Sequence, residues 1–214
     1  MSVTVKLATS LDARIATAAG ESRWITGPES REQVHRLRAA HSAVVVGIET
    51  ALTDDPELTV RLPGYAGRQP ARVILDSRQR LSADCKLVRT AREVPTYVVA
   101  TGAPRPDLVD LGVRVLTAPA IAQDRPDLET VVRMLAAEGL PDLFVEGGGQ
   151  VAGSFLRCGL VDALEWFRAP ILLGGEGRPG VGALAVAALA EAPHFRRVEV
   201  GVLGDDLWER YTRG

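Results

Sequence analysis

The distribution of apolar residues along the chain predicts alternating strands and helices. Residues 3–8 (VTVKLA) alternate apolar and polar side chains, as expected of a half-buried strand. Short apolar runs rich in β-branched residues are typical of parallel strands that are buried on both faces. Such runs occur at 43–47, 71–76, 95–101, 113–117 and 142–145. These segments predict most of one sheet.

Helices are predicted between several of these strands. The segment TGPES (26–30) has the spacing of a capping box and a proline suited to a first helical turn, so it indicates the start of a helix that ends near residue 40. Residues 126–139 place apolar side chains on one helical face and end in glycine. A third helix is expected from Gln150. Residues 9–26 show no steady period and predict a long loop, and such loops are often functional.

The pattern changes toward the end of the chain. Residues 163–174, 196–204 and 207–213 predict longer, partly alternating strands whose close succession favours antiparallel pairing. The order becomes β-loop-α-β-α-β-β-β-α-β-α, followed by a β-hairpin. We therefore expect an α/β fold over residues 1–214 as a single domain, with a mixed, mostly parallel sheet flanked by helices.

Composition excludes several classes of function. The chain has 214 residues with a net charge of −2, so it lacks the basic surface that nucleic acid requires. Its two cysteines, Cys85 and Cys158, have no metal-like spacing, and we expect no metal. No stretch approaches the ~18 apolar residues of a membrane span. These features predict a cytoplasmic protein with no nucleic-acid or membrane partner.

Candidate chemistry gathers where the predicted strands end. Ligands bind outside the carboxyl ends of parallel strands. Thr50 follows the first buried strand, Ser77 and Arg78 follow the second, and Glu146 with three glycines follows the strand at 142–145. If these strands are neighbours, the three turns form one crevice.

The triple glycine allows two interpretations. Glycine lets a backbone approach a phosphate closely and adopt positive φ, and a helix start at Gln150 would point its N–H groups at an anion. The alternative is a simple turn, and Glu146 likewise either accepts from a ligand N–H or only stabilises the helix dipole. Asp54 and Arg61 are each more typical of a solvated surface when taken singly, and Trp24 either covers a cofactor ring or packs. The histidines suggest no catalytic arrangement.

Three segments together resemble a known family. They are VTVKLATSLDARIATAAGESRWITGPESREQVHRLRAAHSAVVVGIETALTDDPELTVR (3–61), RVILDSRQRL (72–81) and LFVEGGGQVAGSFLRCGLVDALEWFRAPILLGGEGRP (143–179). In this order they resemble the reductase half of bacterial bifunctional riboflavin-biosynthesis proteins. The resemblance implies a dihydrofolate-reductase-like fold, NADPH as cofactor, and reduction of the ribosylamino group of a 5′-phosphorylated pyrimidine to a ribitylamino group. It also implies a homodimer.

The resemblance assigns roles to individual positions. It implies that Asp54 supplies the proton, with Lys6 or a water as the alternative, and that Arg78 joins Ser77 in binding the adenosine 2′-phosphate. The positions that match cofactor-binding residues are Ala8, Trp24, Thr50, Asp54, Ser77, Gly148, Gly149, Gln150, Val151, Ala152, Gly153 and Ser154. The positions that match substrate-binding residues are Ser22, Arg38, Leu58, Arg61 and Glu146.

The chain departs from the family in three respects. It has no H-x-E with a later P-C-x-x-C, so either the zinc deaminase is a separate protein or the pathway order differs. Ala13 and Glu49 stand where the family usually has glycine, which suggests a changed substrate. Two alternatives stay open: a paralogue that reduces dihydrofolate or another pteridine, and a catalytically silent nucleotide-binding subunit.

Overall fold

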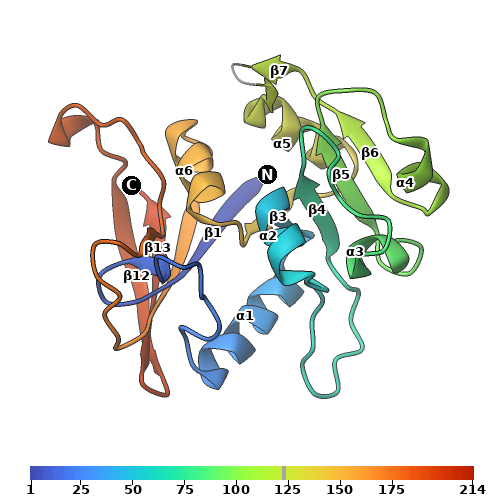
Figure 1. The fold of residues 1–214 in the computed structure, drawn as a ribbon. Coiled ribbons are helices and arrows are strands. Elements are labelled where there is room, and N and C mark those ends of the chain that lie inside the picture. The colour runs from blue at the N-terminus through green and yellow to red at the C-terminus, as the bar shows by residue number, and fades with distance from the viewer. Residues whose placement is uncertain (122–123) are drawn as a thin grey trace. The chain divides into compact units, whose positions relative to one another are not determined.

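The computed structural model describes residues 1–121 and 124–214 (Figure 1). The chain forms two compact units. The first contains Met1 and residues 35–144, and the second contains residues 2–34 and 145–214. The chain therefore passes from the second unit into the first and back again.

The first unit is built on adjacent parallel strands. Val44, Val45 and Val46 in the first of these strands are completely buried, as the apolar run predicted. The strands of this unit lie in the order β9, β3, β4, β5, β6, and β3 to β6 are parallel neighbours. Their bounds are Ala43–Gly47 for β3, Ala71–Leu75 for β4, Thr96–Ala100 for β5, Arg114–Thr117 for β6 and Asp142–Val145 for β9. The predicted parallel body of the sheet is confirmed.

Helices of uneven length connect these strands. The predicted helix near the end of this unit is α5, which buries Leu128, Val131, Val132 and Leu135 and is followed by Gly139 with φ 79°. Two single-turn helices were not predicted, because four or five residues are too short to show a helical period. The helices are α2 (Ile48–Asp54), α3 (Lys86–Arg89), α4 (Pro106–Asp110) and α5 (Leu128–Ala137), and β7 (Ala120–Ile121) pairs with β8 (Arg125–Pro126).

A buried guanidinium joins several of these elements. Arg72 on β4 is 1% exposed, and its Nη2 donates to the carbonyls of Leu87, Thr90 and Val94 at 3.0–3.1 Å. Its Nε donates to Thr96 Oγ1 at 3.0 Å. Burial lowers the pKa of Arg72 to about 10, so the side chain stays protonated at neutral pH.

We expect Arg72→Met to lower the free energy of unfolding by ~3 kcal/mol or more. The variant leaves several buried carbonyls without donors, and each such group costs ~1–3 kcal/mol. Urea unfolding at pH 6 and pH 8 should give the same loss, because the pKa of about 10 lies above both. Arg89→Met, at an exposed position on α3, is the control and should change stability by less than ~0.5 kcal/mol. A loss of less than ~1 kcal/mol for Arg72→Met would contradict this role.

The second unit combines parallel and antiparallel pairing. Strand β1 pairs with β10 in parallel, β10 pairs with β13 antiparallel, and β13 forms the predicted hairpin with β12. Strand β10 ends before Pro170, which has no N–H to donate to a sheet, so it is shorter than predicted. The bounds are Ser2–Thr9 for β1, Ala163–Arg168 for β10, Phe195–Leu203 for β12 and Asp206–Arg213 for β13.

Smaller elements complete this unit. The segment predicted as a long loop contains β2 (Arg14–Ala16), which pairs with β11 (Arg178–Pro179). Helix α6 (Gly149–Arg157) begins one residue earlier than predicted, and a 3-10 turn spans Leu189–Glu191. Helix α1 (Pro28–Ala40) starts in this unit and ends in the other.

The capping box predicted for Thr26 and Glu29 is wrong. Helix α1 begins at Pro28, and the Gly27 carbonyl accepts from Arg31 N, so Gly27 is the N-cap. The Gly27 N–H donates to Asp206 Oδ2 at 2.7 Å, and Ser30 Oγ donates to the same oxygen at 2.6 Å. A carboxylate from β13 therefore caps the helix, which a local sequence pattern cannot indicate.

Candidate functional site

In the first unit, two of the predicted turns lie at the same edge of the sheet. Gly47 at the end of β3 is the register partner of Leu75 at the end of β4, and both strands run in the same direction. Helix α2 follows β3 and carries Thr50 and Asp54 four residues apart, hence on one helical face. The predicted neighbourhood of the turn that carries Thr50 with the turn that carries Ser77 is therefore confirmed within this unit.

The turn after β4 has a well-defined backbone. Asp76 is completely buried, and its Oδ2 accepts from Leu81 N at 2.9 Å. Gln79 has φ 51°, and its carbonyl accepts from Arg105 Nη1 at 2.7 Å. This frame leaves Ser77 half-buried and the Arg78 side chain 73% exposed, with Nη2 3.8 Å from Asp124 Oδ2. Arg78 is thus accessible to an anionic ligand.

The segment after Asp54 is a folded loop with strained positions. Asp55 has φ 40° and Leu58 has φ 55°, both in the left-handed region. The Leu58 side chain is only 3% exposed, whereas Arg61 is exposed and lies 3.3 Å from Glu57 Oε2. Of these predicted substrate contacts, only Arg61 presents its side chain to solvent.

Side chains from outside this loop fix its shape. Arg38 was predicted as a site residue, whereas His35 and Gln69 were not. Arg38 Nη1 donates to the Thr59 carbonyl at 2.9 Å, so the protein itself uses part of this guanidinium. His35 Nδ1 accepts from the Arg61 N–H at 3.2 Å. Gln69 Oε1 accepts from Val60 N at 2.7 Å, and its Nε2 donates to the Val60 carbonyl at 3.1 Å. The spacing of His35 and Arg38 on one helical face was the available signal.

We expect His35→Ala to raise KM for a phosphorylated substrate by about threefold to tenfold and to leave kcat within twofold. The variant removes one hydrogen bond to the backbone of Arg61, which is worth ~0.5–1.5 kcal/mol. His35→Asn should restore most of the affinity, because Oδ1 can occupy the place of Nδ1. Steady-state kinetics at saturating cofactor measure both values. Equal KM values for the Ala and Asn variants would show that this hydrogen bond has no role.

In the second unit, Lys6 lies beside a buried carboxylate that was not predicted. Lys6 on β1 is the register partner of Glu165 on β10, so both side chains leave the same face of the sheet. Glu165 is 1% exposed, and its Oε2 accepts from Trp208 Nε1 at 2.7 Å. Oε1 lies 3.3 Å from Arg210 Nε without hydrogen-bond alignment. Burial raises the pKa of Glu165. Ala8 is two residues further along β1 and is half-buried.

The loop before α1 carries two further predicted residues. Ser22 is exposed, and Trp24 is 71% exposed. The Arg31 guanidinium lies over the Trp24 ring, with Cζ 4.6 Å from the ring centroid. Trp24 therefore does not pack in the core of its unit. Of the two interpretations of this residue, the one in which it packs inside the protein is removed.

The glycines of the glycine-rich turn do not all serve the same purpose. None of Gly147, Gly148 and Gly149 has positive φ. A Cβ on Gly149 would lie 2.4 Å from the Pro179 carbonyl oxygen, and one on Gly153 would lie 3.1 Å from Gly182. A Cβ on Gly148 would meet nothing within 4 Å. Gly149 and Gly153 thus allow close backbone packing inside the protein, and Gly148 alone leaves open space.

The other predicted site residues of this segment also differ in whether they face the interior or the surface. Ala152 is buried, whereas Gln150 is exposed and Val151 is half-buried. Ser154 Oγ accepts from Arg157 Nη2 at 2.9 Å. Glu146 is half-buried directly before the glycines. The open side of the helix start is therefore formed by Gly148, Gln150 and Val151.

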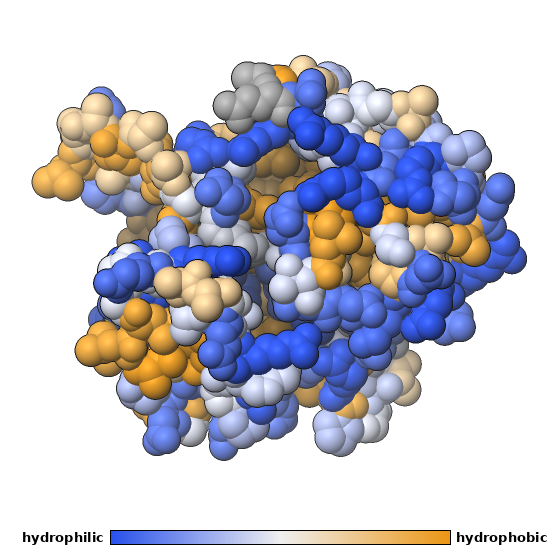
Figure 2. All heavy atoms as spheres, viewed as in Figure 1, coloured by the Kyte–Doolittle hydropathy of each residue, from blue (hydrophilic) through white to orange (hydrophobic). Residues whose placement is uncertain are grey.

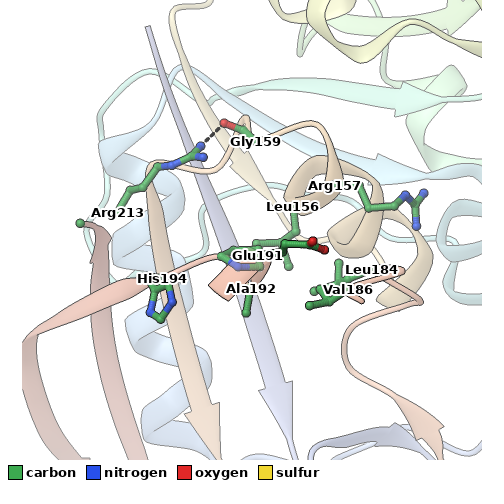
Figure 3. Close-up of a pocket in the computed structure, with 11 residues that line it drawn as sticks. Leu156, Arg157, Gly159, Leu184, Val186, Glu191, Ala192, His194 and Arg213 are labelled. Carbon is green, nitrogen blue, oxygen red and sulfur yellow. Dashed lines mark hydrogen bonds between the residues drawn. The ribbon is translucent and has the colours of Figure 1, made fainter. Parts of the chain in front are cut away.

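One cavity of this unit lies away from these residues. It has a volume of about 340 Å³ and is lined by the end of α6 and by residues 184–194, including His194 and Glu191 (Figure 3). Arg213 borders it and donates to the Gly159 carbonyl. This cavity contains none of the predicted site residues.

The unusual Ala13 and Glu49 have structural consequences. Ala13 has φ 60°, a conformation that favours glycine. Glu49 forms an ion pair with Arg80.

Within the described residues, no group of three or more His, Cys, Asp or Glu side chains is arranged to hold a metal ion. In the same part of the chain, no helix has the length and apolar character needed to span a membrane.

Comparison with known proteins gives consistent matches. Residues 1–208 match the family model described as the RibD C-terminal domain. The chain is 35% identical over 210 residues to riboflavin biosynthesis protein RibD of Bacillus amyloliquefaciens, covering 96% of this chain and 55% of the relative. It is 35% identical over 213 residues to 2,5-diamino-6-ribosylamino-4(3H)-pyrimidinone 5′-phosphate reductase of Methanothermobacter thermautotrophicus, covering 98% of this chain and 97% of the relative. The chain thus spans about half the length of the RibD relatives but nearly all of the archaeal one.

Solved structures identify the fold. RibD of Acinetobacter baumannii matches with a TM-score of 0.89 and 33% identity, covering all of this chain and 58% of the other. Dihydrofolate reductase of Enterococcus faecalis matches with a TM-score of 0.56 at 15% identity, covering 100% of this chain and 96% of the other, which shows the fold alone. The predicted dihydrofolate-reductase-like α/β fold is confirmed.

Proposed function

Because this chain belongs to the RibD C-terminal domain family, we propose that it is an NADPH-dependent reductase of riboflavin biosynthesis. The substrate is a 5-amino-6-(5-phosphoribosylamino)pyrimidine, and reduction at the ribose C1 converts its ribosylamino group to ribitylamino. The observation that carries the proposal is the match along 97% of an archaeal protein named as a reductase of such a compound.

The residues present fit a dinucleotide. Gly148 leaves open space at the start of the nine-residue helix α6, where N–H groups without intrahelical partners favour a phosphate. Trp24 offers an exposed aromatic face, and Ser77 with the exposed Arg78 would bind the 2′-phosphate. Thr50, Ala8 and the residues up to Ser154 complete the proposed cofactor contacts. When bound, NADPH supplies the hydride.

The chain's own residues orient the substrate and manage a proton. Arg61 and Ser22 bind the sugar phosphate, with Arg38 both holding the loop at Thr59 and contributing charge. The buried Leu58 belongs to the same loop and contributes to substrate binding, and Glu146 accepts from the pyrimidine. Orientation alone can supply a large part of the rate enhancement. Asp54 gives the proton that the reduced product needs, and Lys6 is the second candidate for this step.

A direct assay tests the proposal and its alternatives. The purified protein should oxidise NADPH, followed by absorbance, with the deaminated or the undeaminated ribosylaminopyrimidine phosphate. Oxidation with dihydrofolate instead would establish the pteridine alternative. Tight NADPH binding without turnover on any of these compounds would establish a silent nucleotide-binding subunit. Comparing the two pyrimidines identifies the substrate, and a clear preference for either is compatible with the proposed reaction.

We also propose a cytoplasmic homodimer. On strand β12, Val198, Val200 and Val202 are 44%, 55% and 76% exposed. Figure 2 shows apolar residues at the surface of one face of the molecule. Exposed apolar rows of this kind are typical of association surfaces. Sedimentation velocity at micromolar concentration should give twice the chain mass, and a monomer under these conditions would contradict the proposal.

A further inference from the structure

Trp24 combines features that are unusual for a surface residue. Its side chain is 71% exposed, although tryptophan is a large and mostly apolar residue that is highly buried on average. It is also the only tryptophan among the large side chains exposed at this level in the described residues. A single exposed apolar side chain is common on protein surfaces, but this one lies in the loop for which the sequence resemblance implies cofactor contact.

The indole nevertheless has one partner. The Arg31 guanidinium lies over its ring with 4.6 Å between Cζ and the ring centroid, within the range of a cation–π interaction. Arg31 is itself fixed, because Nη1 donates to the Thr26 carbonyl at 2.9 Å and its backbone N–H donates to the Gly27 carbonyl at 3.2 Å. The guanidinium therefore links the first turn of α1 to the loop that carries Trp24.

This arrangement makes the two faces of the indole unequal. One face is covered by a cation, and the high exposure of the side chain leaves the other available for stacking. Cation–π attraction strengthens as the pair loses water, so a planar ring stacked on the open face would strengthen the Arg31–Trp24 contact as well. The pair is thus more favourable with a ligand than without one.

We propose that Arg31 is a positioning residue for the cofactor, holding Trp24 so that the open face of its indole stacks on a planar ring of NADPH. The inference rests on the proposed function. Both the nicotinamide and the adenine are planar rings, and the structure requires only that one of them meets the indole. Arg31 touches Trp24 and the backbone, so its effect on binding must pass through Trp24.

A double-mutant cycle tests this dependence. NADPH is titrated against the wild type, Arg31→Ala, Trp24→Ala and the double variant, with binding followed by nicotinamide fluorescence. We expect Arg31→Ala to weaken NADPH about fivefold while kcat changes less than twofold. In the Trp24→Ala background, removal of Arg31 should have no further effect beyond twofold. Arg31→Lys should recover part of the affinity, because an ammonium retains the cation but not the planar fork.

Two additions separate the possible results. Adenosine 2′,5′-bisphosphate lacks nicotinamide, so its binding is measured by displacement of fluorescent NADPH. Its affinity depends on Arg31 only if the adenine is the stacked ring. Arg36→Ala, at an exposed position on the same helix, controls for the loss of a positive charge and should bind NADPH normally. The inference would be overturned if removing Arg31 lowered NADPH affinity equally with and without Trp24, or did not lower it at all. Either result would leave the reductase proposal intact. Failure of the wild type to bind NADPH would overturn both.

Discussion

Replacing Asp54 with asparagine is expected to lower kcat by ~100-fold or more, since a positioned proton donor contributes ~10²–10⁴-fold to a rate. The asparagine would keep the size of the side chain and its capacity for hydrogen bonds but would have no acidic proton to give. Asp54 is the last residue of α2 and lies on the same helical face as Thr50. Because asparagine has the same size as aspartate, the backbone of the turn should be unchanged. The dissociation constant for NADPH should stay within about threefold of the wild-type value.

The neighbouring acid provides a matched control for this variant. Asp55 Oδ1 accepts from Lys86 N at 2.9 Å, and an asparagine can accept the same bond. Asp55→Asn should therefore retain kcat within twofold. Single-turnover and steady-state rates measured together separate the chemical step from product release. If Asp54→Asn retains wild-type turnover, Asp54 is only a binding residue, and Lys6→Met becomes the next variant to measure.

The sequence predicted those parts of the molecule that depend on local patterns. The runs that became β3, β4 and β5 are apolar because both faces of these strands are buried, and this property is visible in five residues. The register that brings the ends of β3 and β4 together follows from parallel pairing. For this reason the neighbourhood of the Thr50 turn with the Ser77 turn could be predicted.

Contacts between distant segments could not be predicted in the same way. His35 accepts from Arg61 across 26 residues, and Glu165 accepts from Trp208 across 43 residues. Asp206 caps a helix that begins far earlier in the chain. Each contact depends on tertiary packing, for which a single sequence carries no periodic signal. The same limit explains why the sequence did not reveal the close backbone packing of Gly149 against Pro179.

Substitutions in that glycine run should separate internal packing from ligand contact. We expect Gly149→Ala to lower the free energy of unfolding by ~2–3 kcal/mol, the range found for forced overpacking. Its Cβ would lie 2.4 Å from the Pro179 carbonyl oxygen, which is backbone and cannot rotate away. The close approach is required because Gly182 N donates to the Gly149 carbonyl at 2.7 Å. Thermal and urea unfolding measure the loss, and NADPH affinity should fall with it as segment 179–182 moves.

Gly148→Ala is the informative partner of that variant. Gly148 has φ −65° and ψ 175°, which alanine adopts readily, and its Cβ would meet no atom within 4 Å. Stability should therefore change by less than ~0.5 kcal/mol. If the cofactor phosphates approach the start of α6, the added methyl group occupies their space, and we expect NADPH to bind at least tenfold more weakly. Unchanged NADPH affinity in Gly148→Ala would place the phosphates elsewhere, and Gly149 would then serve only the packing of α6 against residues 179–182.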